Sequence, residues 1–299
     1  RFGGPPEVTH SMSSTTRTAT PPAGSIGGED SHRTKGLLRL TMACNERCPF
    51  CNVPAEDYEV LSPPMEAIRR ELQSFLDDGA KTLTISGGEP TLLRKRLVLL
   101  VTEARAGGVQ FVEIQTNAVL VTPDYARDLV AAGVTSAFVS FLSHIPALHE
   151  ALTELEGSFE KCLAGIDAML DAGIRVTLNP VMATATQALI GDYIDFVANR
   201  LPGVRFVSMS AVQPHGRGKH HLELMPDYGV LRASVPDARR RAEHHGIEVV
   251  NPYCGLPLCI GWDDDPTHSV EAWESRRGGW RQTQGIENRG DKSHGPPCR

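Results

Sequence analysis

Three cysteines within eight residues are the feature of this sequence that most directly indicates chemistry. Cys44, Cys48 and Cys51 lie in the segment 44–51, which reads CNERCPFC and directly follows an apolar run at 37–42. Soft thiolates gathered so closely suit an iron–sulfur cluster or zinc. A cubane held by only three cysteines keeps one iron without a protein ligand, and this iron is open for chemistry. Pro49 disfavours a continuous helix, so we expect a loop wrapped around the metal group.

Structural zinc and a disulfide framework are the alternatives for these thiols. Structural zinc normally takes four Cys or His ligands, and no His or Cys follows Cys51 within about forty residues. The chain has only 7 cysteines in 299 residues and starts without a secretory segment, which argues against a disulfide framework. We therefore expect a reduced, cytoplasmic protein in which the three thiols hold an iron–sulfur cluster.

A second motif, Ser86-Gly87-Gly88-Glu89-Pro90, follows the β-rich run at 82–85. Paired glycines allow positive φ and let the backbone approach a ligand closely. Glu89 offers a carboxylate to an ammonium group. Taken alone, this motif is more often a turn than a binding site.

The elements that must position both motifs follow a βα repeat. β-rich runs alternate with segments of helical period, which predicts a parallel sheet; the runs are 37–42, 82–85, 110–115, 135–141, 175–180 and 204–210. Ser62 is a plausible N-cap for the first helix, which Gly79 ends, and a later helix runs from Ser158 to Gly173. The loops after such strands converge at one edge of the sheet, where parallel α/β folds bind ligands. Residues 247–250 are a candidate last strand.

The two motifs together resemble the signature of the radical S-adenosylmethionine (SAM) enzymes. The resemblance covers about residues 37–212 and implies an α/β fold, an open (β/α)6 partial TIM barrel. It implies that Cys44, Cys48 and Cys51 hold a [4Fe–4S] cluster whose open iron is chelated by SAM. Reductive cleavage of SAM would then give a 5′-deoxyadenosyl radical that removes hydrogen from a substrate. An electron donor such as flavodoxin or ferredoxin is the expected partner.

The resemblance also suggests residues around SAM. Gly87, Gly88, Glu89 and Pro90 match the family's motif for the amino group of SAM. Asn117, Ser140 and Asn179, at the ends of the third to fifth strands, are similar to its polar residues near the carboxylate and ribose; a turn cap is the alternative for each. His144, His149 and His215 could also face this edge, with solvent exposure the default. Cys162 lies beside an apolar helical stripe, so we expect it in the core.

The two ends of the chain differ from its middle. Residues 1–35 are rich in Ser, Thr, Pro and Gly, which predicts a disordered tail before a core at 36–215. The extension at 216–299 carries Cys254, Cys259 and Cys298 and little regular pattern. It resembles the twitch or SPASM extensions that hold auxiliary iron–sulfur clusters, so these cysteines are candidate ligands of a second cluster. Three free or buried thiols are the alternative.

Charge and hydropathy limit the partners. The net charge of −6 does not favour nucleic acid or an anionic membrane surface, and no apolar run approaches the ~18 residues that span a bilayer. A cysteine-bearing extension is similar to those of peptide maturases, so a peptide or protein side chain is the favoured substrate. A small-molecule enzyme similar to the GTP cyclase of molybdenum-cofactor synthesis is the alternative within this chemistry. A non-catalytic iron–sulfur or zinc protein is the alternative outside it, and the G-G-E-P motif argues against that reading.

Overall fold

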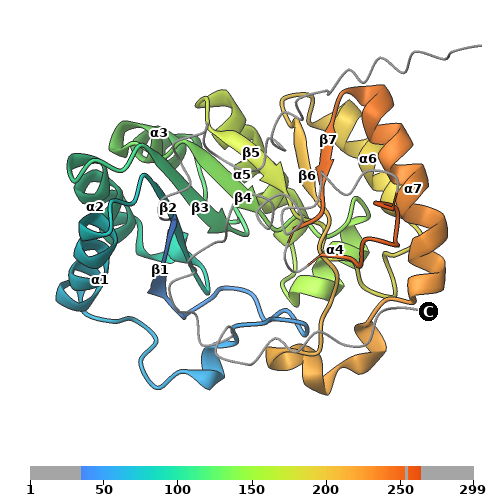
Figure 1. Cartoon of the computed structure of the whole chain (residues 1–299), viewed down its shortest axis with the longest axis horizontal. Helices are drawn as coiled ribbons and strands as arrows, with labels where there is room; N and C mark the ends of the chain where they lie inside the picture. The colour runs from blue at the N-terminus through green and yellow to red at the C-terminus, as the bar shows by residue number, and fades with distance from the viewer. Residues whose placement is uncertain (1–34, 253–254, 264–299) are drawn as a thin grey trace, which may run out of the picture.

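The chain forms a curved, parallel sheet covered by helices (Figure 1). The computed structural model describes residues 35–252 and 255–263. Its strands pair in sequence order, and every pairing is parallel. They are β1 (Lys35–Thr41), β2 (Thr82–Gly87), β3 (Phe111–Thr116), β4 (Ser136–Val139), β5 (Arg175–Leu178), β6 (Phe206–Ser208) and β7 (Glu248–Val250). Because β1 and β7 form the two edges, the predicted open partial barrel is confirmed.

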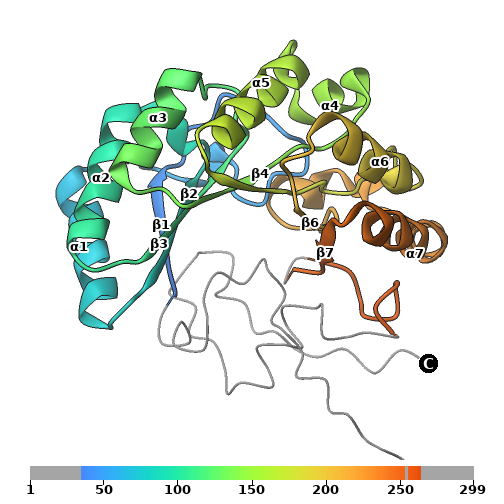
Figure 2. The same ribbon diagram turned by 90° about the horizontal axis from the view of Figure 1, so that it is seen from above.

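Helices connect successive strands and lie along the outer face of the sheet (Figure 2). They are α1 (Met65–Asp77), α2 (Arg94–Ala106), α3 (Pro123–Ala132), α4 (Pro146–Thr153), α5 (Ser158–Asp171), α6 (Ile190–Arg200) and α7 (Tyr228–His245). Short 3-10 helices are η2 (Ala55–Asp57), η3 (Pro90–Leu93), η4 (Gly216–His220) and η5 (Leu222–Leu224). This arrangement leaves the carboxyl ends of the strands and their loops at one edge.

The main core lies between the sheet and these helices. In α1 the apolar stripe predicted from the sequence is buried, with Ile68, Leu72 and Phe75 each at most 4% exposed. The start of α1 differs from the prediction, because Pro64 occupies the N-cap position. Ser62 instead pairs its hydroxyl with that of Thr41 at 2.9 Å, which joins the segment before α1 to the end of β1.

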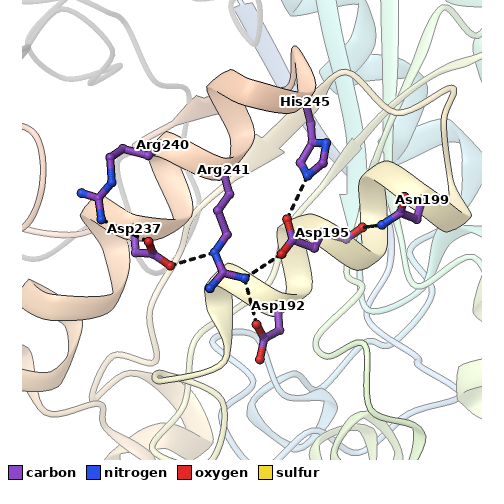
Figure 3. A network of polar contacts seen from close by, with 7 residues as sticks. All are labelled: Asp192, Asp195, Asn199, Asp237, Arg240, Arg241 and His245. Atoms are coloured by element: carbon purple, nitrogen blue, oxygen red, sulfur yellow. Dashed lines mark hydrogen bonds and ion pairs between the residues drawn. The ribbon is translucent and has the colours of Figure 1, made fainter.

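After residue 215, where the predicted core ends, α7 completes the sixth βα unit and β7 adds a seventh strand to the sheet. β7 pairs with β6, as the candidate strand at 247–250 suggested. Arg241 of α7 forms ion pairs with Asp192 and Asp195 of α6 at 2.9 and 2.6 Å, and with Asp237 at 2.8 Å (Figure 3). His245 contacts Asp195 at 2.8 Å. The ion pairs of Arg241 with Asp192 and Asp195 thus tie α7 to α6.

Residues 255–263 pack against α7. The indole of Trp262 is fully buried in the main core, and the guanidinium of Arg239 stacks 5.3 Å from its centroid. Cys259 is half-buried and packs on the same core. Within the described part of the chain, no helix has both the length and the apolar character needed to cross a membrane.

Candidate functional site at the carboxyl edge of the sheet

The cysteine loop, residues 44–51, leaves the carboxyl end of β1 and contains no helix, as Pro49 predicted. Hydrogen bonds fix its backbone: among them, the Arg47 amide donates to the Thr153 carbonyl at 3.0 Å, and the Cys51 amide donates to the Cys48 carbonyl at 3.1 Å. All three of its thiols are free. The loop therefore presents three free thiols at the edge where ligands of parallel sheets bind.

Three thiols in one loop are a donor set that suits an iron–sulfur cluster. Burial raises the pKa of the Cys48 and Cys51 thiols. Among residues 35–252 and 255–263, no three His, Cys, Asp or Glu side chains converge on one ion position. Each thiolate of a cubane ligates a different iron, so its ligands surround the cluster and do not meet at a point.

The two glycines of the second motif lie against the end of β1. Gly87 has φ +143°, and a Cβ at Gly87 would collide with the carbonyl oxygen of Thr41. A Cβ at Gly88 would lie 2.5 Å from the Met42 carbonyl oxygen and closer still to that of Ala43. Gly88 also donates its amide to the Thr41 carbonyl at 2.7 Å. The glycines therefore allow close contact with the segment that enters the cysteine loop, a use that the sequence analysis did not anticipate.

Glu89 is almost completely buried, and its carboxylate connects the ends of β2 and β3. One oxygen accepts from the Thr91 amide at 2.8 Å and from the hydroxyls of Thr91 and Thr116 at 2.6 and 2.8 Å. The other accepts from the Asn117 amide at 2.7 Å. Burial raises the pKa of the Glu89 carboxyl, and these donors oppose that rise. Pro90 follows as the first residue of η3, which Glu89 caps.

Asn117 joins the second motif to the cysteine loop. Its side-chain amide donates to the side-chain oxygen of Asn45 at 2.9 Å. Two buried polar atoms beside the thiols have no protein partner: the Asn45 side-chain nitrogen and one carboxylate oxygen of Glu46. The other Glu46 oxygen lies 3.5 Å from the Cys48 sulfur. Because buried polar atoms are normally paired, these two are suited to contact a bound ligand.

Ser140 and Asn179 follow β4 and β5 at the same edge. Ser140 is half-buried and donates its backbone amide to the Thr116 carbonyl at 3.1 Å. Asn179 is buried, and its side-chain oxygen accepts from the Ser210 hydroxyl at 2.7 Å. The structure thus brings the predicted polar residues of β3, β4 and β5 to one edge of the sheet, each with a local role as well.

A contact between two distant loops was missed by the sequence analysis. Arg217, in η4, forms a bidentate ion pair with Glu56, in η2, at 2.5 and 2.6 Å. Its guanidinium also donates to the Cys48 carbonyl at 3.3 Å. Nothing in the sequence around Arg217 signals this contact, because its two partners lie 161 residues apart in the chain.

A small apolar cluster accompanies the cysteine loop. Phe50 packs with buried side chains that follow β4, β5 and β6, namely Leu142, Ala183 and Val212, together with Leu152 of α4. Half-buried Val181, Leu224, Met225 and Cys48 pack against this group. The cluster is separate from the main core and therefore gives this edge an apolar lining beside its polar residues.

The predicted histidines differ in their surroundings. His149 is fully buried between Phe141 and Phe159, so the expectation of solvent exposure is wrong for it. Its Nδ1 accepts from the Leu142 amide at 3.3 Å, and burial lowers its pKa to about 4. His144 is half-buried beside Phe196, and His215 precedes η4 as its exposed N-cap residue.

The remaining cysteines are divided between the core and the extension. Cys162 is fully buried in α5, as predicted. Cys259 lies on the main core, whereas Cys254 and Cys298 lie outside the described residues. The ligand set of a second cluster thus stays a prediction.

A parallel partial barrel with a three-thiol loop after its first strand defines an α/β enzyme that works with an iron–sulfur cluster. The sequence model of the Radical SAM superfamily matches residues 38–197, and the chain belongs to this family of enzymes. The cofactors of the family are a [4Fe–4S] cluster and SAM, and the donor set of the cysteine loop suits the first of them.

Proteins that are similar to this chain are named for different activities. A probable GTP 3′,8-cyclase of Sulfurisphaera tokodaii is 29% identical over 240 residues, which cover 75% of this chain and 74% of the relative. A PqqA peptide cyclase of Streptomyces rochei is 28% identical over 256 residues, 80% of this chain and 64% of the relative. The solved structure of SuiB from Streptococcus suis bound to SAM superposes with TM-score 0.59 at 17% identity, over 78% of this chain and 53% of SuiB. The last likeness shows the fold alone.

Proposed function

We propose that Cys44, Cys48 and Cys51 hold the [4Fe–4S] cluster of this radical SAM enzyme and that SAM binds beside them, over the ends of β1 to β5. Together the two cofactors supply reductive cleavage of SAM and a 5′-deoxyadenosyl radical that removes a hydrogen atom from the substrate. The observation that carries this proposal is the meeting of three free thiols with buried, unpaired polar atoms at one edge of the sheet.

The surrounding residues then position SAM. The unpaired nitrogen of Asn45 and the unpaired oxygen of Glu46 supply a donor and an acceptor for its polar groups. Gly87, Gly88, Glu89 and Pro90 shape the loop that faces its amino group. A separate set of polar residues surrounds its carboxylate and ribose: Asn117, Ser140 and Asn179.

A peptide or protein side chain is the substrate that the apolar surface of this edge supports best. Val60, Leu61 and Leu222 expose 58%, 41% and 58% of their surface. The first two belong to the segment that bonds to the end of β1, and Leu222 lies in η5, after β6. Exposed apolar side chains beside half-buried ones suit a peptide segment better than a polyphosphate. The similarity to a PqqA peptide cyclase agrees with this substrate class.

A nucleotide is the second candidate. It is favoured by the similarity to probable GTP 3′,8-cyclases, which extends over about three quarters of both chains. A reduced flavodoxin or ferredoxin would supply the electron for either substrate.

Iron and SAM assays test the cofactor part of the proposal. Anaerobically reconstituted protein should carry about four iron atoms per chain, or about eight if the extension holds a second cluster on Cys254, Cys259 and Cys298. With dithionite and SAM it should release 5′-deoxyadenosine. The triple variant C44A/C48A/C51A should release none and lose about four iron atoms. Full iron content in this variant would overturn the ligand assignment.

A second assay separates the two substrate classes. The reduced enzyme is incubated with SAM and either GTP or a pool of random peptides, and the products are analysed by mass spectrometry. Peptides whose mass changes only with SAM and dithionite support the peptide proposal. A GTP product, with no change in any peptide, favours the nucleotide instead.

A further inference from the structure

The segment after β6 is packed directly on the cysteine loop. The Arg217 amide donates to the Cys51 carbonyl at 2.9 Å. Gly216 has φ +51°, and a Cβ there would collide with the same carbonyl oxygen. Gly218 lies beside Phe50, with its Cβ position 3.9 Å from the Phe50 Cα. The backbone of residues 216–218 therefore fits the cysteine loop too closely to be only a surface turn.

The side chain of Arg217 extends this contact across the open side of the barrel. Its guanidinium binds both oxygens of Glu56, which lies 161 residues earlier, and also donates to the Cys48 carbonyl. β1 is an edge strand and does not pair with β6, so the sheet itself does not join these two loops. Arg217 is only 17% exposed, whereas Glu56 is 53% exposed. The cation is thus held at the loop, and its counter-charge faces solvent.

The charge of Arg217 acts on two of the candidate cluster ligands. It lies close enough to interact electrostatically with the thiols of Cys48 and Cys51. Reduction of a bound cluster adds one negative charge, and a nearby cation stabilises the reduced state more than the oxidised one. A solvent-exposed carboxylate partly offsets this effect, because water screens it more strongly.

We infer that Arg217 is a positioning residue for the cluster: it fixes the backbone of Cys48 and Cys51 and raises the reduction potential of the cluster, while Glu56 lowers it. This inference rests on the proposed ligand set. It assigns the Arg217–Glu56 pair a role in the electron-transfer step that precedes SAM cleavage, in addition to closing the open side of the barrel.

Two neutral variants with opposite expected shifts test the inference. Anaerobic dithionite titration monitored by electron paramagnetic resonance measures the midpoint potential of the reconstituted full chain. R217Q should shift it to a more negative value, because it leaves the Glu56 charge alone. E56Q should shift it to a more positive value, because it leaves the Arg217 charge uncompensated. R217K keeps the charge but loses the bidentate fork, so it should retain the potential and hold less iron.

Arg241 provides the matched control, because R241Q removes the same charge from the α6–α7 network (Figure 3). Its midpoint should equal that of the unmodified chain. Equal potentials in R217Q, E56Q and the unmodified chain would overturn the inference, and so would shifts of the same sign in both variants, which a purely structural pair would produce. If R217Q holds no cluster, the midpoint potential of E56Q alone tests the inference. A more positive potential supports it, and an equal or more negative potential contradicts it. Failure of the unmodified chain to bind any cluster would instead contradict the proposed function.

Discussion

Replacing Glu89 by alanine should destabilise the whole fold and not only weaken SAM binding. The carboxylate accepts from four donors at the ends of β2 and β3. Two of them, the hydroxyls of Thr91 and Thr116, can rotate toward other acceptors. The backbone amides of Thr91 and Asn117 cannot, and both are buried.

The size of the effect follows from these two amides. Each buried donor left without an acceptor costs about 1–3 kcal/mol, so Glu89→Ala should lower the free energy of unfolding by about 2–6 kcal/mol. This is a large part of the ~5–15 kcal/mol that stabilises a typical domain. Glu89→Gln should cost less, because its amide oxygen still accepts from Thr91 and Thr116, while its NH2 group faces the Asn117 amide.

Urea unfolding of the metal-free protein, followed by far-UV circular dichroism, measures this change without SAM. Glu103→Ala is the control, since Glu103 pairs with exposed Arg69 on the helical surface and its loss should leave the midpoint almost unchanged. If Glu89→Ala unfolds at the urea concentration of the unmodified chain, the buried network does not hold these strand ends. The carboxylate would then act on a ligand alone.

Two more predictions concern single positions. Gly88→Ala forces a methyl group against two backbone carbonyls and should lower stability by about 1–3 kcal/mol and also reduce iron content after reconstitution; Gly173→Ala, which has positive φ but open space, should lower stability by about 1–2 kcal/mol and leave iron content unchanged. The pKa of His149 is lowered to about 4 in the folded protein. As the pH falls, His149 therefore binds a proton in the unfolded chain at a higher pH than in the folded chain. The free energy of unfolding should therefore decrease between about pH 6.5 and pH 4, by up to about 3 kcal/mol. Urea titrations across this range should show that slope, and His149→Phe should remove it while lowering stability at every pH; an unchanged slope in His149→Phe would contradict the assignment.

Much of the fold could be predicted from the sequence because its signals are local. Alternation of β-rich runs with helical periods requires only neighbouring residues, and it located all six predicted strands to within a few residues. The cysteine loop and the G-G-E-P motif are contiguous, so their residue types identified the family before any contact was known. The burial of Cys162 followed from the same helical period.

Other parts of the site depend on contacts between segments far apart in the chain. Nothing in the sequence around Glu89 shows that its carboxylate accepts a hydrogen bond from the amide of Asn117, 28 residues later. Likewise, nothing in the sequence around Gly88 shows that this residue packs on the end of β1. His149 has the sequence surroundings of a surface residue, but the fold places it between two phenylalanines.

The Arg217–Glu56 pair shows the limit most clearly. Each residue alone is a charged side chain in a polar loop, for which solvent is the expected surrounding. Only the curvature of the sheet brings the loop after β6 over the loop after β1, and only then does burial convert an ordinary cation into one that acts on two thiols. The sequence by itself determined which candidate ligand residues are present and which strands they follow. The tertiary structure decided which charges surround them, because charge interactions depend on distance through space and on exclusion of water, and neither is encoded in spacing along the chain.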